Sequence, residues 1–200
     1  MSKIEQSMAD KAPTQAGPQA TFRLKKTVVM VGMMGAGKTA VGRAVAQKLD
    51  VAFLDSDAEI EAAANMTVPE IFSRDGEPFF RTKETQVITR LLDATPCILS
   101  TGGGAFLGAQ NREAISARGV SVWLKADLDL LWNRVRHKDT RPLLQTDDPK
   151  ATLAALFQAR VPVYRMADVM VPSDHGVAID AMADRVIEAI LARSDVLEKT

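Results

Sequence analysis

The sequence contains the segment Val28-Val29-Met30-Val31-Gly32-Met33-Met34-Gly35-Ala36-Gly37-Lys38-Thr39, in which an apolar run leads into glycines, a lysine and a hydroxyl. Four of its residues, Gly32, Gly37, Lys38 and Thr39, fit the phosphate-loop pattern G-x-x-x-x-G-K-[ST]. The apolar run predicts a buried strand, and residues 40–49 after the loop predict a helix. Because pattern and context agree, we favour a phosphate site over a strand–turn–helix corner that binds no ligand.

This arrangement suits polyphosphate for physical reasons. Glycines let the backbone curl so that successive N–H groups face anionic oxygens, and the helix that begins there adds the positive end of its dipole. Lys38 would reach the β- and γ-phosphates, and the Thr39 hydroxyl would bind Mg²⁺. The segment therefore predicts a site for a nucleoside triphosphate with Mg²⁺.

Composition excludes several other classes of protein. The 200 residues include 25 basic and 25 acidic ones, so nothing indicates a general binder of nucleic acid or membrane surfaces. No apolar run approaches the roughly 20 residues of a membrane-spanning helix, and the N-terminus lacks the apolar core of a signal peptide. The single cysteine, Cys97, cannot form an internal disulfide, which fits a reducing, cytoplasmic setting.

The rest of the chain predicts one α/β domain. Residues 1–25 are polar and aperiodic, and we interpret them as a flexible extension before a domain at 26–195. Apolar strands alternate with amphipathic helices, which favours a five-stranded parallel sheet between two helical layers. The predicted strands are 28–31, 51–54, 97–100, 120–124 and 168–171. A polar segment with two prolines, about 138–149, is long enough to form a lid.

Two candidate sites follow predicted strands. Asp55 and Asp57 come after the second strand, and residues two apart on a strand can face the same ligand. The alternative is that Asp57 merely caps the helix starting at Ala58. The glycine triplet at 102–104 follows the third strand, where it would let the backbone approach a ligand, although a flexible turn is the alternative.

Arginines recur near strand ends and the lid. Arg81, Arg141 and Arg160 can form bidentate bonds to carboxylates or phosphates. A small anionic acceptor could therefore be held by Arg81 and Arg160, with Asp57 accepting hydrogen bonds from its hydroxyls. Glu84 lies three residues after Arg81 and shares its helix face, although such pairs are often surface ion pairs of little value.

At this point the sequence resembles the shikimate kinase family, in the nucleoside-monophosphate-kinase-like branch of phosphate-loop enzymes. The matching stretches run in the family's order: Gly32-Met-Met-Gly-Ala-Gly-Lys-Thr-Ala-Val-Gly42, Phe53-Leu-Asp-Ser-Asp57, Ile71-Phe-Ser-Arg-Asp-Gly-Glu77 with Phe80-Arg81 and Glu84, Ser100-Thr-Gly-Gly-Gly-Ala105, Arg141-Pro-Leu-Leu144, and Arg160-Val-Pro-Val-Tyr164 with Ala167-Asp168. The resemblance implies a three-layer α/β/α phosphate-loop NTPase fold with substrate-binding helices at about 57–94 and a lid. It implies transfer of the ATP γ-phosphate to the 3-hydroxyl of shikimate, in aromatic amino-acid biosynthesis, by a monomer.

The resemblance also implies a role for each matching residue. The residues that would hold ATP are Gly35, Ala36, Gly37, Lys38, Thr39, Ala40 and Arg141. Thr39 would bind Mg²⁺, and Asp55 would support the metal through water. The residues that would hold shikimate are Asp57, Arg81, Gly103 and Arg160. Lys38, Asp57 and Arg141 would be catalytic, Glu84 would orient Arg81, and Phe80 would line the pocket. Arg136 falls near a position that commonly flanks adenine.

One stretch departs from the family pattern. The region after the fifth strand, 171–176, matches poorly, so no adenine contact is carried over there. Two other functions remain: a gluconate-type kinase of the same branch, and a catalytically silent relative that serves as a binding module. The second is disfavoured because silent relatives typically lose the loop lysine or an acceptor arginine, and this chain keeps Lys38, Arg81 and Arg160.

Overall fold

The computed structural model describes residues 21–137 and 142–200. Its strands are β1 Phe22–Leu24, β2 Thr27–Val31, β3 Phe53–Asp55, β4 Ile98–Ser100, β5 Gly119–Ala126, β6 Val169–Ser173 and β7 Leu197–Lys199. Its α-helices are α1 Lys38–Leu49, α2 Ser56–Ala64, α3 Val68–Leu92, α4 Ala109–Arg118, α5 Leu128–Val135, α6 Pro149–Tyr164 and α7 Ile179–Leu191. Short 3₁₀ turns lie at Ala105–Leu107 and Pro142–Leu144.

A five-stranded parallel sheet forms the centre of the described chain, in the order β3-β4-β2-β5-β6. Strand β2 is central and fully buried, as its apolar run predicts. The chain reaches β4 on one side of β2 and then β5 on the other side. Ligands of open α/β sheets bind at such a switch point, beyond the carboxyl ends of the strands. The phosphate loop begins at this end of β2.

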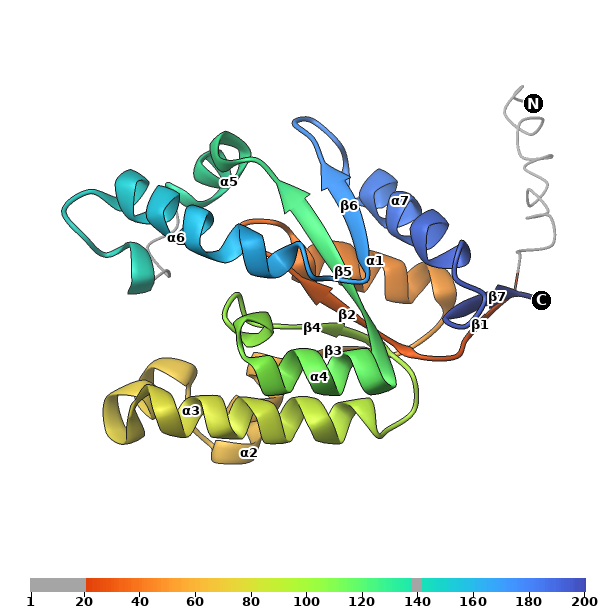
Figure 1. The fold of residues 1–200 in the computed structure, drawn as a ribbon, viewed down its shortest axis with the longest axis horizontal. Coiled ribbons are helices and arrows are strands. Elements are labelled where there is room, and N and C mark those ends of the chain that lie inside the picture. Colours follow the sequence, from red (N-terminus) through yellow and green to blue (C-terminus); the bar gives the residue numbers. More distant parts are fainter. Residues whose placement is uncertain (1–20, 138–141) are drawn as a thin grey trace, which may run out of the picture.

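Helices cover both faces of the sheet, which confirms the predicted three-layer α/β/α fold (Figure 1). Helix α1 packs against α7, and α3 packs against α4. The core between them is apolar and includes Met30, Ile98 and Leu99, all with no exposed side chain. Helices α2 and α3 form the lower part of the molecule in Figure 1, apart from α5 and α6.

Helix α3 spans most of the predicted substrate-binding region, about 57–94. It begins where Thr67 and Glu70 have the spacing of a capping box, and in the structure each side chain accepts a hydrogen bond from the other residue's backbone N–H. Gly76, with φ 82°, interrupts it where the Asp-Gly pair predicts a break. The second half then restarts at Pro78 and carries Arg81 and Glu84.

Three boundaries differ from the sequence-based expectations. The sequence predicts a helix at about 150–160 that Pro162 disturbs, but helix α6 continues past Pro162 to Tyr164. The proline removes one backbone donor, and the next turn closes again through Arg165 N–H to the Val161 carbonyl. Residues 22–24, assigned to the extension, pair as β1 with β7, so the ordered domain continues beyond residue 195. Both strands have only three residues, too few for a periodic signal. The remainder of the predicted extension, residues 1–20, lies outside the described residues.

Within residues 21–137 and 142–200, no helix combines the length and the apolar character needed to cross a membrane.

Candidate active site

The phosphate loop is shaped to receive an anion. Gly35 has φ 81°, and an added Cβ there would lie 2.7 Å from a Val135 methyl, so only glycine fits. Gly37 is the N-cap of α1, and no side chain caps the helix or adds an acidic group in its first turn. The N–H groups of the first turn can therefore bond a phosphate.

Lys38 lies folded over this loop. Its Nζ donates to the carbonyls of Gly32 at 2.8 Å and Met33 at 3.1 Å, and its side chain is buried. The ammonium group is thereby fixed beside the space that the loop encloses. A positive charge held in a poorly hydrated position stabilises a phosphate more strongly than one in bulk water does.

Oxygen donors suited to Mg²⁺ meet beside the loop. The Thr39 hydroxyl lies 3.3 Å from Asp55 Oδ2 and 3.2 Å from Ser100 Oγ. Within residues 21–137 and 142–200, no group of three or more His, Cys, Asp or Glu side chains could hold a metal. Mg²⁺ commonly keeps several waters and takes one or two protein oxygens together with substrate phosphates, so this donor set fits it.

A cleft of about 460 Å³ extends from the loop. Beyond the loop it is lined by Arg134 and by the apolar side chains of Val177, Ile179 and Met182, which suit a flat heterocyclic base. Arg134 donates to the carbonyls of Gly35 and Ala36, at 3.3 and 3.4 Å. The arginine that lines this cleft is thus Arg134. The sequence suggests Arg136, which is not among the lining residues.

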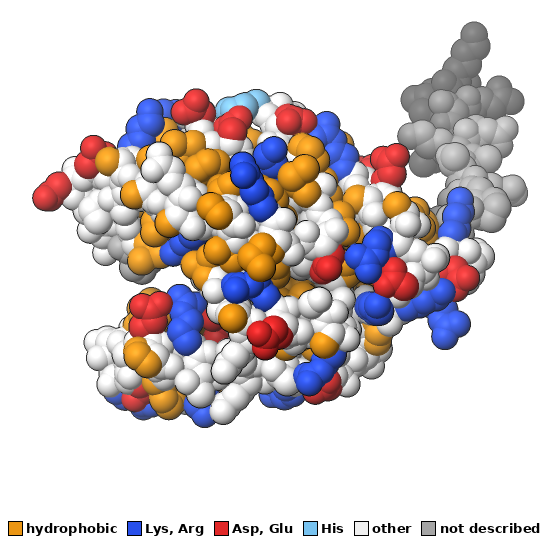
Figure 2. All heavy atoms as spheres, in the orientation of Figure 1, with side chains coloured by type: hydrophobic (Ala, Val, Ile, Leu, Met, Phe, Trp, Pro, Cys, Tyr) orange, Lys and Arg blue, Asp and Glu red, His pale blue; other side chains and the backbone are white. Residues whose placement is uncertain are grey.

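A second cleft of about 550 Å³ adjoins the first. The two share Met34, Asp57, Gly102 and Gly103 in their linings, so the phosphate end of one opens toward the other. The second cleft also contains Arg81, Glu84 and Arg160, with Phe72, Phe80 and Leu143 among its apolar residues. Figure 2 shows the molecule hollowed between the part that contains α3 and the part that contains α6, with acidic and basic side chains at the lower rim.

The glycine triplet after β4 brings the predicted acceptor residues together. An added Cβ at Gly102 would lie 2.8 Å from Asp57 Oδ1, and one at Gly104 would lie 2.6 Å from Arg81 Nη2. One at Gly103 would lie 3.6 Å from Arg160 Nη1. Each glycine therefore lies against a different candidate side chain. At Gly102 and Gly104 only the absence of a side chain permits that approach, which disfavours the flexible-turn alternative, whereas a Cβ at Gly103 would make an ordinary contact.

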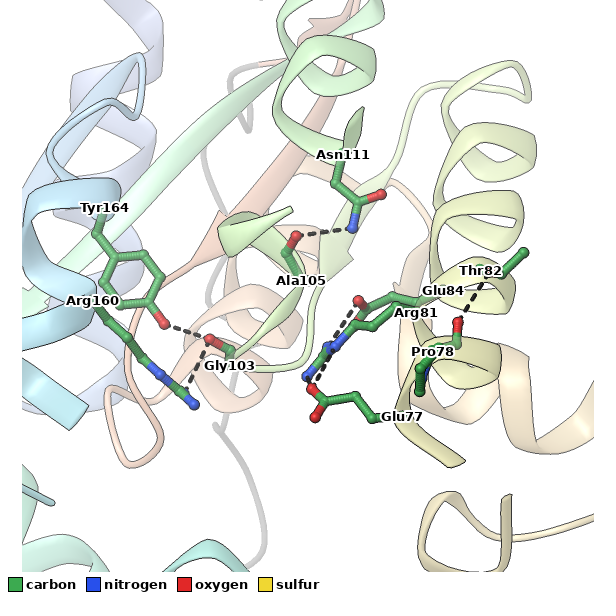
Figure 3. A network of polar contacts seen from close by, with 10 residues as sticks. All are labelled: Glu77, Pro78, Arg81, Thr82, Glu84, Gly103, Ala105, Asn111, Arg160 and Tyr164. Carbon is green, nitrogen blue, oxygen red and sulfur yellow. Dashed lines mark hydrogen bonds and ion pairs between the residues drawn. The ribbon is translucent and has the colours of Figure 1, made fainter. Parts of the chain in front are cut away.

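Arg81 is held in place from its own helix (Figure 3). Its Nη1 donates to Glu84 at 2.9 Å, and its Nη2 and Nε donate to Glu77 at 3.0 and 3.2 Å. Glu84 is only 1% exposed, so this pair is far from the solvated ion pair that helix spacing alone would suggest. Among the described residues, these bonds engage three of the five N–H groups of Arg81, and the others can bond an anion.

Comparisons with known proteins show the family to which this chain belongs. The family model described as "Shikimate kinase" matches residues 34–191. A shikimate kinase of Ruegeria pomeroyi is 67% identical over 198 residues, which cover 99% of each chain. The chain belongs to the shikimate kinase family.

Solved structures agree with this assignment to the shikimate kinases. A shikimate kinase from Acinetobacter baumannii, solved in complex with shikimate, is 40% identical with a TM-score of 0.79, and the match covers 84% of this chain and 94% of that one. A gluconokinase from Sinorhizobium meliloti has a TM-score of 0.56 at 16% identity, covering 85% and 94% of the two chains. At that identity the likeness concerns the fold alone.

In this shikimate kinase fold, Asp57 is the unusual carboxylate of the cleft. Asp55, rather than Asp57, is the N-cap of α2, since its side chain accepts the Asp57 N–H at 3.1 Å. The capping alternative for Asp57 is therefore wrong. Burial, reinforced by the neighbouring Asp55, raises the pKa of Asp57 to about 6, although Lys38 and Arg81 oppose the shift. Its Oδ1 is buried without a hydrogen-bond partner among the described residues, as expected of an atom placed to bond a ligand.

The site includes residues that sequence reasoning missed. Arg134 supports the phosphate loop, Ser100 joins the Thr39–Asp55 cluster, and the Tyr164 hydroxyl bonds the Gly103 carbonyl. Ser100 and Tyr164 stood inside the matching family stretches, which was the only signal for them. Arg141 lies outside the described residues.

Proposed function

We propose that this chain transfers the γ-phosphate of ATP to the 3-hydroxyl of shikimate, giving shikimate 3-phosphate and ADP. The observation that supports this most strongly is the glycine triplet, which lies against Asp57, Arg81 and Arg160 at the junction of the two clefts. In the reaction, the acceptor oxygen bonds the γ-phosphorus, the bond from phosphorus to the β–γ bridging oxygen breaks, and the hydroxyl proton leaves.

The phosphate loop would hold the donor. The N–H groups of residues 35–40 and the Lys38 ammonium would bond the phosphates, and Lys38 would offset the charge that spreads over the transferred group. Thr39, with Asp55 and Ser100 behind it, would hold Mg²⁺, which would offset the negative charge of the phosphates. The apolar wall of Val177, Ile179 and Met182 supports placement of the adenine there.

The second cleft would hold the acceptor. The shikimate carboxylate would lie between the guanidinium groups of Arg81 and Arg160, because planar forks of donors match a carboxylate. Asp57 would accept hydrogen bonds from the ring hydroxyls and receive the departing proton. The Gly103 backbone would contact the ring, and Phe80 would line its apolar side.

Arg141 is proposed, from the family resemblance, to close over the phosphates as part of a lid at about 138–149. Closure would exclude water, which otherwise competes with the hydroxyl for the phosphoryl group. We also infer that the enzyme is a cytoplasmic monomer without nucleic-acid or membrane partners, on the basis of the balanced charge and the family.

A coupled assay of ADP release with shikimate and with gluconate tests the acceptor. We expect turnover with shikimate and none with gluconate. Turnover with gluconate and none with shikimate would establish the gluconate-type alternative. Arg160→Ala should raise the KM for shikimate about 10- to 150-fold, the value of charge-assisted hydrogen bonds, and leave the KM for ATP nearly unchanged. Arg165→Ala is the matched control, because Arg165 is exposed at the C-cap of the same helix. An equal loss for both substrates would exclude Arg160 from the acceptor site.

A further inference from the structure

Tyr164 does not line the acceptor cleft, but it contacts Gly103, which does. It is the last residue of α6, one turn after Arg160, and its side chain is completely buried. Its hydroxyl donates to the carbonyl of Gly103, and Arg160 Nη1 approaches the same oxygen at 3.5 Å (Figure 3). The tyrosine bond is short, whereas the arginine bond is at the outer limit of a hydrogen bond.

The ring of Tyr164 is fixed by the sheet. It stacks on Trp123 of β5 with 6.2 Å between the ring centroids and 25° between the planes. Trp123 in turn borders the phosphate loop, since an added Cβ at Gly32 would lie 3.2 Å from its Cδ1. Burial raises the pKa of Tyr164 to about 12, against the opposing effect of Arg160, so the hydroxyl remains a donor at neutral pH.

Gly103 depends on this support. It has no side chain to pack, and its neighbours in the triplet lie against Asp57 and Arg81. Its own fixed contacts include the two hydrogen bonds that its carbonyl accepts, from Tyr164 and from Arg160. If the hydroxyl were absent, the Gly103 carbonyl would need another donor, and the nearest is Arg160. An arginine that satisfies a backbone carbonyl offers fewer donors to a carboxylate ligand.

We propose that Tyr164 is a positioning residue for the acceptor: by bonding the Gly103 carbonyl, it fixes the glycine triplet and keeps Arg160 available for the substrate carboxylate. This inference rests on the proposed function, because it takes the acceptor to be the carboxylate-bearing shikimate. It assigns Tyr164 no contact with the substrate.

The test is Tyr164→Phe, which keeps the ring and its stacking and removes only the hydroxyl. We expect the KM for shikimate to rise about tenfold, while kcat and the KM for ATP change less than about twofold. Ser121→Ala is the matched control, since the Ser121 hydroxyl is also buried but bonds Asp168, away from both clefts. The control should leave both KM values unchanged, even where it lowers the melting temperature.

A double-mutant cycle separates positioning from a general loss of structure. In an Arg160→Ala background, Tyr164→Phe should raise the KM for shikimate by much less than tenfold, because only the contribution that Tyr164 makes through the glycine triplet remains. Equal tenfold effects in both backgrounds would overturn the proposal, as would an unchanged KM in the single variant. Wild-type turnover with shikimate is measured first, so that a failure of the proposed function is recognised separately.

Tyr164 is the single tyrosine of the chain, so it can be observed in the wild-type sequence even if the Tyr164→Phe variant does not fold. Replacing tyrosine throughout by 3-fluorotyrosine labels Tyr164 alone and retains its hydroxyl. We expect its single fluorine resonance to shift when shikimate saturates the enzyme. A resonance that does not move would overturn the proposal.

Discussion

The substitution Gly104→Ala would place a methyl group too close to the guanidinium of Arg81. An added Cβ there would lie 2.6 Å from Nη2, 2.8 Å from Nη1 and 3.0 Å from Cζ. To restore an ordinary contact of about 3.4 Å, the guanidinium must move by about 0.8 Å. The backbone itself accepts alanine, because Gly104 has φ −98° and ψ −17°. Gly104→Ala should therefore displace Arg81 without unfolding the chain.

The size of the effect follows from the bonds that Arg81 would make. Charge-assisted hydrogen bonds contribute about 1.5–3 kcal/mol, so losing a correctly placed guanidinium weakens shikimate binding by about 10- to 150-fold. Steady-state kinetics should show this as a raised KM for shikimate with the KM for ATP nearly unchanged. Glu84, which is buried behind Arg81, resists a compensating movement.

Gly108→Ala is the matched control on the same loop. Its added Cβ would meet only ordinary contacts, at 3.5 Å from Asn111 and 3.6 Å from Ala105, and the residue is outside both clefts. We expect the control to keep wild-type KM values. If Gly104→Ala also kept them while its melting temperature stayed normal, the placement of Arg81 in the acceptor site would be refuted.

Three further variants test the remaining parts of the site. Lys38→Ala should lower kcat by about 10²- to 10³-fold in the coupled assay, because a charge matched to the transition state is lost; near-normal turnover would contradict the loop assignment. Thr39→Val should raise the Mg²⁺ concentration for half-maximal rate about tenfold, as expected when an oxygen near a metal is removed, and an unchanged titration would exclude Thr39 from the metal site. For Asp57, with a folded pKa of about 6, kcat/KM for shikimate should fall as the pH drops below 6. Because this pKa lies above the unfolded value of 3.8, Asp57 contributes stability that is fully present below pH 4 and lost as the pH rises through 6. Asp57→Asn should abolish this change in chemical denaturation, and a variant with the same pH dependence would show that another group titrates.

The local elements of the fold could be predicted because each carries its own signal. The buried run of β2, the phosphate-loop glycines and the Thr67–Glu70 capping box are dictated by short-range chemistry. The pairing of β1 with β7 could not be predicted, since it joins residues about 175 positions apart and each strand is too short to show a period.

The residues of the site also divide into those that the sequence could predict and those that it could not. Carboxylates, guanidinium groups and glycines near strand ends suggest ligand contacts, which is why the sequence predicts Asp57, Arg81, Gly103 and Arg160. Tyr164 gave no such signal, because a tyrosine near a helix end usually belongs to the core. Its contribution depends on which carbonyl its hydroxyl meets, and that is decided by how α6 packs over the loop after β4.

The most direct test of the two adjoining clefts is a crystal structure of this chain with shikimate, ADP and Mg²⁺ bound. The decisive measurement is the distance from the shikimate carboxylate to the guanidinium groups of Arg81 and Arg160. We expect hydrogen-bond distances of about 2.7–2.9 Å to both, with a ring hydroxyl at Asp57 and the β-phosphate on the N–H groups of residues 35–39. Shikimate bound away from these arginines, or with its carboxylate turned toward Asp57, would contradict the account.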